Sequence, residues 1–231
     1  PPLVMAEPWR AAVVGVGRMG QSYAAAFDTY PDTTLVALVD PSAERAEAAC
    51  QRFSVPNHFR TVQEMLDSDC NPQIVSVITP GAYFKDAVLA CATSPSSVRA
   101  VQVEKPFGGP LEDADEMCAA CEAAGIVFAG GNMQVAMNEV QEMAARIRSG
   151  EFGAITGCSV HGVGSEYLGG GCQHIAVLRS MTGMDITEVT AWMSPSGGLT
   201  IPGLGAVDAV DVRLPAPPPP PPPPAQPPHH R

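Results

Sequence analysis

The chain has 231 residues, of which 45% are hydrophobic and 16% are charged, a composition typical of a globular protein and not of a largely disordered one. The chain contains 13 lysines and arginines and 24 aspartates and glutamates, which gives a net charge of −11. Such an acidic chain lacks the basic surface that holds a nucleic-acid backbone, so nucleic acid is not an expected partner. The longest apolar runs are far shorter than the ~20 residues that cross a bilayer, so no membrane partner is expected either.

From residue 10 onward, short apolar runs alternate with stretches of helical pattern. The expected strands comprise residues 11–16, 35–39, 73–79, 98–103 and 126–129. The expected helices comprise residues 18–27, 41–53, 82–93 and 112–124, and a short helix begins at a capping box formed by Thr61 and Glu64. Strands that alternate with helices of about 10–15 residues form right-handed βαβ units. We therefore expect an α/β fold with a doubly wound parallel sheet.

The pattern changes after Gly130 and Gly131. Helices are expected at residues 138–149, with Asn138 as the N-cap, and at residues 172–181; strand-like stretches comprise residues 154–163, 186–193 and 206–214. This arrangement indicates a second, partial α/β domain with an open sheet. The expected domains are therefore residues 1–130 and 131–214.

Residues 215–231 are dominated by proline, including eight consecutive prolines from Pro217 to Pro224. Proline lacks the amide that a sheet or a helix needs, so this segment is expected to be a disordered polyproline II tail. A partner that recognises proline-rich segments is the alternative to a merely solvated tail.

The seven cysteines are an odd number and show no disulfide framework, which favours reduced thiols and a cytoplasmic protein. The chain opens with two prolines and not with methionine, so a removed targeting segment stays an alternative. Cys118 and Cys121 have the spacing of a metal or redox pair, but no second pair accompanies them. We expect them to pack in the core, and we expect no metal site.

A glycine-rich turn follows the first expected strand and opens the first helix: Gly15-Val-Gly17-Arg18-Met19-Gly20. Gly15 permits the tight turn, Gly17 lets the backbone approach a pyrophosphate, and Gly20 lets the helix pack closely on the strand. The amides at the helix N-terminus, among them those of Arg18 and Met19, favour an anion. The sequence therefore predicts a dinucleotide-binding turn.

Asp40 ends the second expected strand, 20 residues after Gly20. A carboxylate at that position can accept hydrogen bonds from both ribose hydroxyls of an adenosine. It also repels a 2′-phosphate, so NAD is favoured over NADP as the cofactor. Arg45 lies about one turn into the next helix and can bind that phosphate, which leaves NADP as the alternative.

Three further motifs follow the glycine turn in chain order: Thr79-Pro80, then Val103-Glu104-Lys105-Pro106, then Gly131-Asn132. Together the four motifs resemble those of the Gfo/Idh/MocA oxidoreductases, a family that includes glucose–fructose oxidoreductase and inositol dehydrogenase. The resemblance covers about residues 10–214. It implies an NAD(P)-binding Rossmann domain followed by a substrate domain, which is shortened in this chain.

The resemblance also implies an activity and the residues that bind the cofactor. The family transfers a hydride between a nicotinamide cofactor and a sugar, a polyol or a related hydroxy or keto compound. By resemblance, Thr79, Pro80, Glu104, Lys105 and Asn132 contact the cofactor.

Lys105 and His174 are the catalytic residues that the resemblance implies. The ammonium of Lys105 would polarise the reacting oxygen, and the peptide bond before Pro106 is typically cis in the family. His174 would exchange a proton with the substrate hydroxyl, or else serve only as a structural residue at a helix start. Lys85, the one other lysine in the sequence, is expected to be solvated.

Two departures from the family pattern support a second hypothesis. Gly170 stands where the family carries an aspartate four residues before the histidine, and the second domain has few strands. The alternative to an enzyme is therefore a cofactor-binding regulatory or degenerate member without turnover. A small-molecule substrate is the expected partner of the enzyme, and the open sheet of the second domain is the expected surface of a homo-oligomer.

Overall fold

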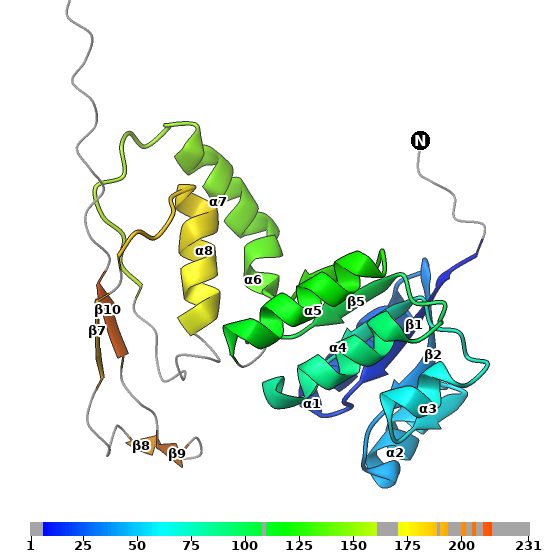
Figure 1. Ribbon diagram of the computed structural model, residues 1–231. Helices are drawn as coiled ribbons and strands as arrows, with labels where there is room; N and C mark the ends of the chain where they lie inside the picture. The colour runs from blue at the N-terminus through cyan, green and yellow to red at the C-terminus, as the bar shows by residue number, and fades with distance from the viewer. Residues whose placement is uncertain are drawn as a thin grey trace, which may run out of the picture. The chain divides into compact units, whose positions relative to one another are not determined.

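The computed structural model describes residues 7–107, 110–160 and 171–188, and the strand residues 190–193, 200–201, 205–206 and 210–213. The chain divides into two compact units, Pro1–Asn132 and Met133–Arg231 (Figure 1). The expected polyproline tail, residues 215–231, lies outside the described residues.

A six-stranded sheet forms the centre of the first unit, with strand order β3-β2-β1-β4-β5-β6 (Figure 1). The strands are β1 (Trp9–Val14), β2 (Thr33–Val39), β3 (Asn57–Phe59), β4 (Ile74–Val77), β5 (Ala100–Val103) and β6 (Val127–Gly130). All neighbouring strands in this sheet pair in parallel, which confirms the doubly wound α/β fold. The strand order reverses between β1 and β4, and ligands of such sheets bind at the carboxyl ends of the strands at this point.

The helices of the first unit lie close to their predicted positions. They are α1 (Arg18–Thr29), α2 (Ala43–Phe53), α3 (Val62–Leu66), α4 (Phe84–Thr93) and α5 (Leu111–Ala123), with a 3₁₀ turn η1 (Gly81–Tyr83) before α4. The capping box of Thr61 and Glu64 is present at the start of α3. The helix expected from residue 41 begins instead at Ala43, because the Ser42 side chain caps it by accepting a hydrogen bond from the Arg45 amide.

Side chains from both faces of the sheet form the core of the first unit. On β1, Ala12 and Val14 join a cluster with residues of α3, α4 and α5, while Val13 joins a second cluster with residues of α1 and α2. Alternate residues of a strand point to opposite faces, so helices cover this sheet on both sides. Cys121 is fully buried in the first cluster and Cys118 is exposed, so the expectation of core packing is right for Cys121 and wrong for Cys118.

The second unit contains three helices and four short strands among its described residues. They are α6 (Met133–Ala136), α7 (Asn138–Arg148), α8 (Cys172–Thr182), β7 (Thr190–Met193), β8 (Thr200–Ile201), β9 (Gly205–Ala206) and β10 (Val210–Arg213). Arg148 at the end of α7 donates a hydrogen bond to the Ser180 carbonyl of α8 at 2.8 Å. β7 pairs with β10, and β8 with β9, both antiparallel.

Two expectations for the second unit are wrong. Residues 154–160 form no strand where one was expected over residues 154–163. Gly157 interrupts this segment, Gly150 and Gly153 precede it, and no described strand pairs with it. Asn138 is the first residue of α7 and not its N-cap, which is Met137 without a side-chain hydrogen bond. Both expectations rested on local pattern, and a strand also requires a partner.

Adjacent aromatic residues at the start of α4 allow a matched test of the core. Phe84 is 0% exposed and Tyr83 is 63% exposed. We expect Phe84→Ala to lower the free energy of unfolding by about 3–5 kcal/mol, because it leaves a cavity in the core. Tyr83→Ala should change it by less than about 0.5 kcal/mol. Urea denaturation followed by circular dichroism measures both, and equal losses would contradict the placement of α4.

Candidate functional site

The glycine turn between β1 and α1 is closed on its inner side by backbone contacts. Gly15 has a φ of +87°, and a Cβ added to it would lie 2.8 Å from the Ile78 carbonyl oxygen. A Cβ added to Gly20 would lie 1.8 Å from the carbonyl oxygen of Gly15. Neither position therefore tolerates a side chain without movement of the backbone, and the turn brings α1 against the ends of β1 and β4.

The outer side of the same turn is open. A Cβ added to Gly17 would meet no atom within 4 Å. Gly17 is the N-cap of α1, no side chain caps the helix, and its first turn holds no acidic residue. Arg18 and Met19, which begin α1, are both exposed. The first amides of α1 and its positive dipole end thus lie beside free space, which suits a phosphate group.

Asp40 links the carboxyl end of β2 to the glycine turn. The residue is 4% exposed, and its Oδ2 accepts a hydrogen bond from the Val16 amide at 3.0 Å. Its Oδ1 accepts hydrogen bonds from the Ser42 amide at 2.9 Å and from Nε of Arg45 at 3.1 Å. The carboxylate is therefore held in place between the turn and α2, with the half-exposed Arg45 guanidinium as its ion-pair partner.

Thr79 and Pro80 follow β4 at the point where the strand order reverses. Cγ2 of Thr79 would lie 3.0 Å from a Cβ added to Gly15, so Thr79 borders the glycine turn. Its Oγ1 is buried and has no hydrogen-bond partner within the described part of the chain. A buried hydroxyl without a partner is rare in folded proteins, and a polar group of a ligand can satisfy it. Pro80 is exposed and precedes η1.

Glu104, Lys105 and Pro106 follow β5, and the peptide bond between Lys105 and Pro106 is cis. Glu104 is 7% exposed. Its Oε1 accepts a hydrogen bond from the Tyr23 hydroxyl at 2.7 Å, and its Oε2 accepts one from the Lys105 amide at 2.9 Å. The side chain of Lys105 is half-buried and makes no ion pair with the described residues.

The sequence analysis missed two residues of this site, Tyr23 on α1 and Gln102 on β5. Nε2 of Gln102 donates to the Tyr23 oxygen at 3.3 Å and to the Val103 carbonyl at 2.9 Å. Burial, followed by the hydrogen bond to Glu104, raises the pKa of Tyr23 to about 12, so its hydroxyl remains a donor at neutral pH. The signal that could have indicated Gln102 is its amide within the otherwise apolar run 100–103.

Lys85 differs from the solvated lysine that was expected. Its ammonium lies 2.6 Å from a Glu116 carboxylate oxygen and 2.9 Å from one of Asp113, so it pairs α4 with α5. The hydrogen bond to Glu116, and then the one to Asp113, raises the pKa of Lys85. Among the described residues, Lys105 is therefore the lysine without an acidic partner.

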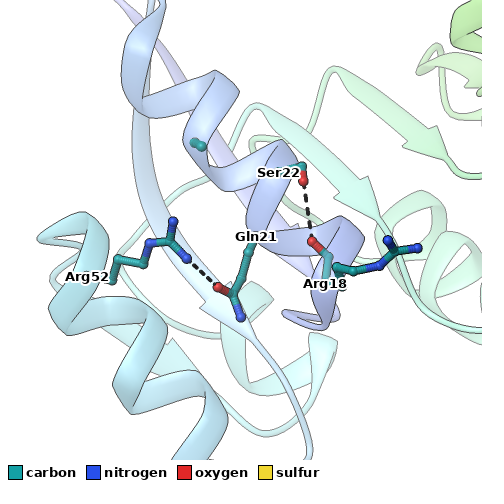
Figure 2. A pocket seen from close by; sticks show the side chains of 5 residues that line it. Arg18, Gln21, Ser22 and Arg52 are labelled. Atoms are coloured by element: carbon teal, nitrogen blue, oxygen red, sulfur yellow. Dashed lines mark hydrogen bonds between the residues drawn. The ribbon is translucent and has the colours of Figure 1, made fainter.

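An open hollow of about 450 Å³ lies on the outer face of α1, lined by Arg18, Gln21, Ser22, Ala25 and Arg52. Arg52 donates a hydrogen bond to Oε1 of Gln21 at 2.7 Å, and Figure 2 shows that the Arg18 guanidinium extends away from this pair. The two guanidinium groups thus do not converge on one point. The lining residues come from α1 and α2 and not from the strand ends.

His174 and Asn132 lie away from the glycine turn in the sequence. His174 is half-buried in the first turn of α8, in the second unit. Asn132 is half-buried, follows β6 and is the last residue of the first unit. The two residues expected to be catalytic, Lys105 and His174, therefore belong to different units.

The described residues contain neither a metal-binding cluster nor a membrane-spanning helix. No group of three or more histidine, cysteine, aspartate or glutamate side chains in the described ranges is arranged to hold a metal ion. None of the helices described is both long enough and apolar enough to span a membrane.

The reversal of strand order between β1 and β4, the glycine turn and the aspartate at the end of β2 define a dinucleotide-binding protein of the Rossmann type. Residues 9–131 match the family described as "Oxidoreductase family, NAD-binding Rossmann fold", the Gfo/Idh/MocA family. The chain belongs to this family, as the resemblance in the sequence predicted.

Curated relatives include dehydrogenases and a hydratase. The chain is 29% identical to 2,7-anhydro-N-acetylneuraminate hydratase of Escherichia coli, over 63% of this chain and 37% of the relative. It is 30% identical to D-apiose dehydrogenase of Paraburkholderia graminis, over 51% of this chain and 30% of the relative. The matched region thus spans about a third of the length of these relatives.

Solved structures show the same fold over most of this chain. Scyllo-inositol dehydrogenase from Lactobacillus casei, with bound NAD(H) and scyllo-inositol, superposes with a TM-score of 0.75 at 18% identity, over 90% of this chain and 66% of that chain. Myo-inositol 2-dehydrogenase from Lactobacillus plantarum also gives a TM-score of 0.75 at 18% identity, over 90% of this chain and 67% of that chain.

Adding one methyl group should have a large effect on stability on the inner side of the glycine turn and a small effect on the outer side. Gly20→Ala should lower the free energy of unfolding by about 1–3 kcal/mol or more, because the new Cβ overlaps the Gly15 carbonyl. Gly17→Ala, whose Cβ meets open space, should change it by about 1 kcal/mol or less. Urea denaturation of the two variants compares them, and a larger loss for Gly17→Ala would contradict the geometry of the turn.

Proposed function

We propose that the chain forms the cofactor-binding part of an NAD(P)-dependent oxidoreductase that acts on a sugar, a polyol or a related hydroxy or keto compound. The observation that carries the proposal is the hydrogen bond from the Val16 amide to the Asp40 carboxylate. It brings the group suited to a ribose beside the turn suited to a pyrophosphate. The names of the apiose and inositol dehydrogenases among the relatives support the substrate class.

The residues at the strand ends fit a nicotinamide dinucleotide. The open space at Gly17 and the first amides of α1 would hold the pyrophosphate, and Asp40 would accept hydrogen bonds from the adenosine ribose. Oγ1 of Thr79, which is buried and has no hydrogen-bond partner among the described residues, would bond a polar group of the same ligand on the β4 side.

The charges around Asp40 support NAD as the preferred cofactor. A 2′-phosphate would meet the buried carboxylate, and the Arg45 guanidinium that could compensate is already bonded to that carboxylate at 3.1 Å. A phosphate placed against this carboxylate would be repelled strongly, because water is largely excluded from the buried Asp40 side chain. NADP is the alternative, because Arg45 is half exposed and can turn toward a phosphate.

Lys105 is the residue we propose for the reaction itself. A bound nicotinamide supplies or accepts the hydride at its C4. The ammonium of Lys105 would polarise the substrate carbonyl, or stabilise the alkoxide in the reverse direction, and it has no carboxylate among the described residues to neutralise it. Glu104 holds the Lys105 amide at 2.9 Å. His174 would give or take the hydroxyl proton.

A regulatory or degenerate family member without turnover is the second candidate function. Its support is Gly170, which stands at the position of the family's aspartate four residues before His174. The same protein would bind the nucleotide and oxidise no substrate, so nucleotide binding and turnover measured together separate the two functions.

Removal of the Asp40 carboxylate tests the cofactor assignment. We expect Asp40→Ser to weaken NADH binding by about tenfold or more, because the ribose loses a charged acceptor. NADPH binding should strengthen, because the repulsion disappears and Arg45 is released. Isothermal titration calorimetry with both nucleotides measures the change in preference. In the double variant Asp40→Ser, Arg45→Ala, the gain in NADPH affinity should be lost. If Asp40→Ser keeps the wild-type preference between NADH and NADPH, the assignment of Asp40 to the ribose site is contradicted.

The two lysines provide a matched test of the reaction. Lys105→Met should reduce turnover of a responsive polyol by about 10²-fold or more while NADH binding weakens less than about tenfold. Lys85→Met, which removes only the ion pairs to α5, should retain turnover. A screen of sugars and polyols with absorbance at 340 nm provides the rates. Equal turnover in wild type and Lys105→Met would exclude Lys105 from the reaction.

A further inference from the structure

A hydrogen-bonded network inside the first unit joins α1 to the end of β5. The Tyr23 hydroxyl lies 2.7 Å from Oε1 of Glu104 although the two residues are 81 positions apart in the sequence. Oε2 of the same carboxylate accepts the Lys105 amide at 2.9 Å. In the described part of the chain, each oxygen of this carboxylate thus accepts a hydrogen bond, one from α1 and one from the residue proposed for the reaction.

The direction of each hydrogen bond in this network is fixed. The side-chain amide of Gln102 has one possible orientation. The atom that lies 2.9 Å from the Val103 carbonyl oxygen must be the nitrogen Nε2, because a carbonyl oxygen can only accept a hydrogen bond. The same nitrogen donates to the Tyr23 oxygen at 3.3 Å. The single hydroxyl proton of Tyr23 is therefore left for Glu104. The chain of donors runs from Gln102 through Tyr23 to Glu104.

Burial makes Tyr23 important for the orientation of Glu104. The carboxylate is 7% exposed and has no arginine or lysine partner among the described residues. A buried carboxylate oxygen that loses its donor is costly, so the group rotates or admits water. Without the Tyr23 hydroxyl, nothing described in the structure would hold Oε1, and Oε2 would no longer be fixed beside the Lys105 amide.

The surrounding backbone keeps this network in place. The Gly131 amide donates to the Val103 carbonyl at 2.7 Å, the same oxygen that accepts from Gln102. A Cβ added to Gly131 would lie 2.9 Å from Nε2 of Gln102, so a side chain at this position would displace the amide. Gly131, which the sequence analysis noted only as part of a family motif, thus leaves room for Gln102.

We propose that Tyr23 is a positioning residue for Lys105. Its hydroxyl orients the Glu104 carboxylate, and the carboxylate fixes the main chain at Lys105, where β5 ends. Because Tyr23 lies on the helix that begins at the glycine turn, the helix proposed to bind the pyrophosphate also sets the position of the lysine proposed to polarise the substrate. This inference rests on the proposed function for the role of Lys105 and on the structure for the network itself.

The presence of only two lysines in the sequence makes a direct test practical. Protein labelled with ¹⁵N-lysine gives two lysine amide signals in a ¹H–¹⁵N spectrum, one from Lys105 and one from Lys85 as an internal reference. In Tyr23→Phe we expect the Lys105 amide proton to move upfield and to exchange with solvent about tenfold faster or more, because its bond to a charged acceptor weakens. The Lys85 amide should not move.

Two further variants keep the test specific. Tyr30→Phe makes the same chemical change on a side chain that is 66% exposed, and it should leave both lysine signals in place. Glu104→Gln should move the Lys105 amide upfield as Tyr23→Phe does, and the double variant should add little to either single change, because both act on one bond. An additive double variant would overturn the proposal.

Other results of the lysine amide experiment would also show whether Tyr23 positions Lys105. If Tyr23→Phe leaves the Lys105 signal and its exchange rate at their wild-type values, or shifts the Lys85 signal equally, Tyr23 does not position Lys105. The spectra are recorded without nucleotide, so this result is independent of the proposed function. NADH added to the same samples tests that function separately: an absence of NADH binding would contradict the proposed function and leave the network intact.

Discussion

The site depends on the close approach of α1 to the ends of β1 and β4, which the contact between Gly20 and the Gly15 carbonyl makes possible. A Cβ on Gly20 would lie 1.8 Å from that oxygen, so no other residue allows the helix to begin so near the sheet. This approach brings the Val16 amide to Asp40 and the Tyr23 hydroxyl to Glu104. The absence of a side chain at Gly20 therefore determines both the geometry of the proposed ribose site and the position of Lys105.

The sheet supplies the rigid base for these contacts. Helices cover both of its faces, and the side chains of β1 pack into two separate clusters, so the strand ends cannot move without disturbing the core. Two buried side-chain atoms there, Oγ1 of Thr79 and Oε1 of Gln102, have no hydrogen-bond partner among the described residues, whereas the Asp40 and Glu104 carboxylates are held by hydrogen bonds. A site held in this way requires little rearrangement when a ligand binds.

The sequence allowed the prediction of features that local chemistry determines. The glycine spacing, the acid at the end of β2, the capping box at Thr61 and the alternation of strands and helices all follow from short-range rules, and all are present. The Tyr23–Glu104 hydrogen bond was not predictable, because it joins residues far apart in the sequence and Tyr23 belongs to none of the motifs. The expected strand at 154–163 failed over its described part, residues 154–160, for a related reason: apolar content indicates a strand only where another strand pairs with it.

The most direct test of the account is amide hydrogen exchange of the full chain with and without saturating NADH. If the dinucleotide lies across the strand ends as proposed, NADH will slow exchange at peptides that contain the glycine turn, residues 15–20. It will also slow exchange at peptides that contain Asp40 and Thr79. Binding of NADH that leaves these peptides unprotected and slows exchange elsewhere would contradict the account. The absence of any NADH binding would contradict it as well.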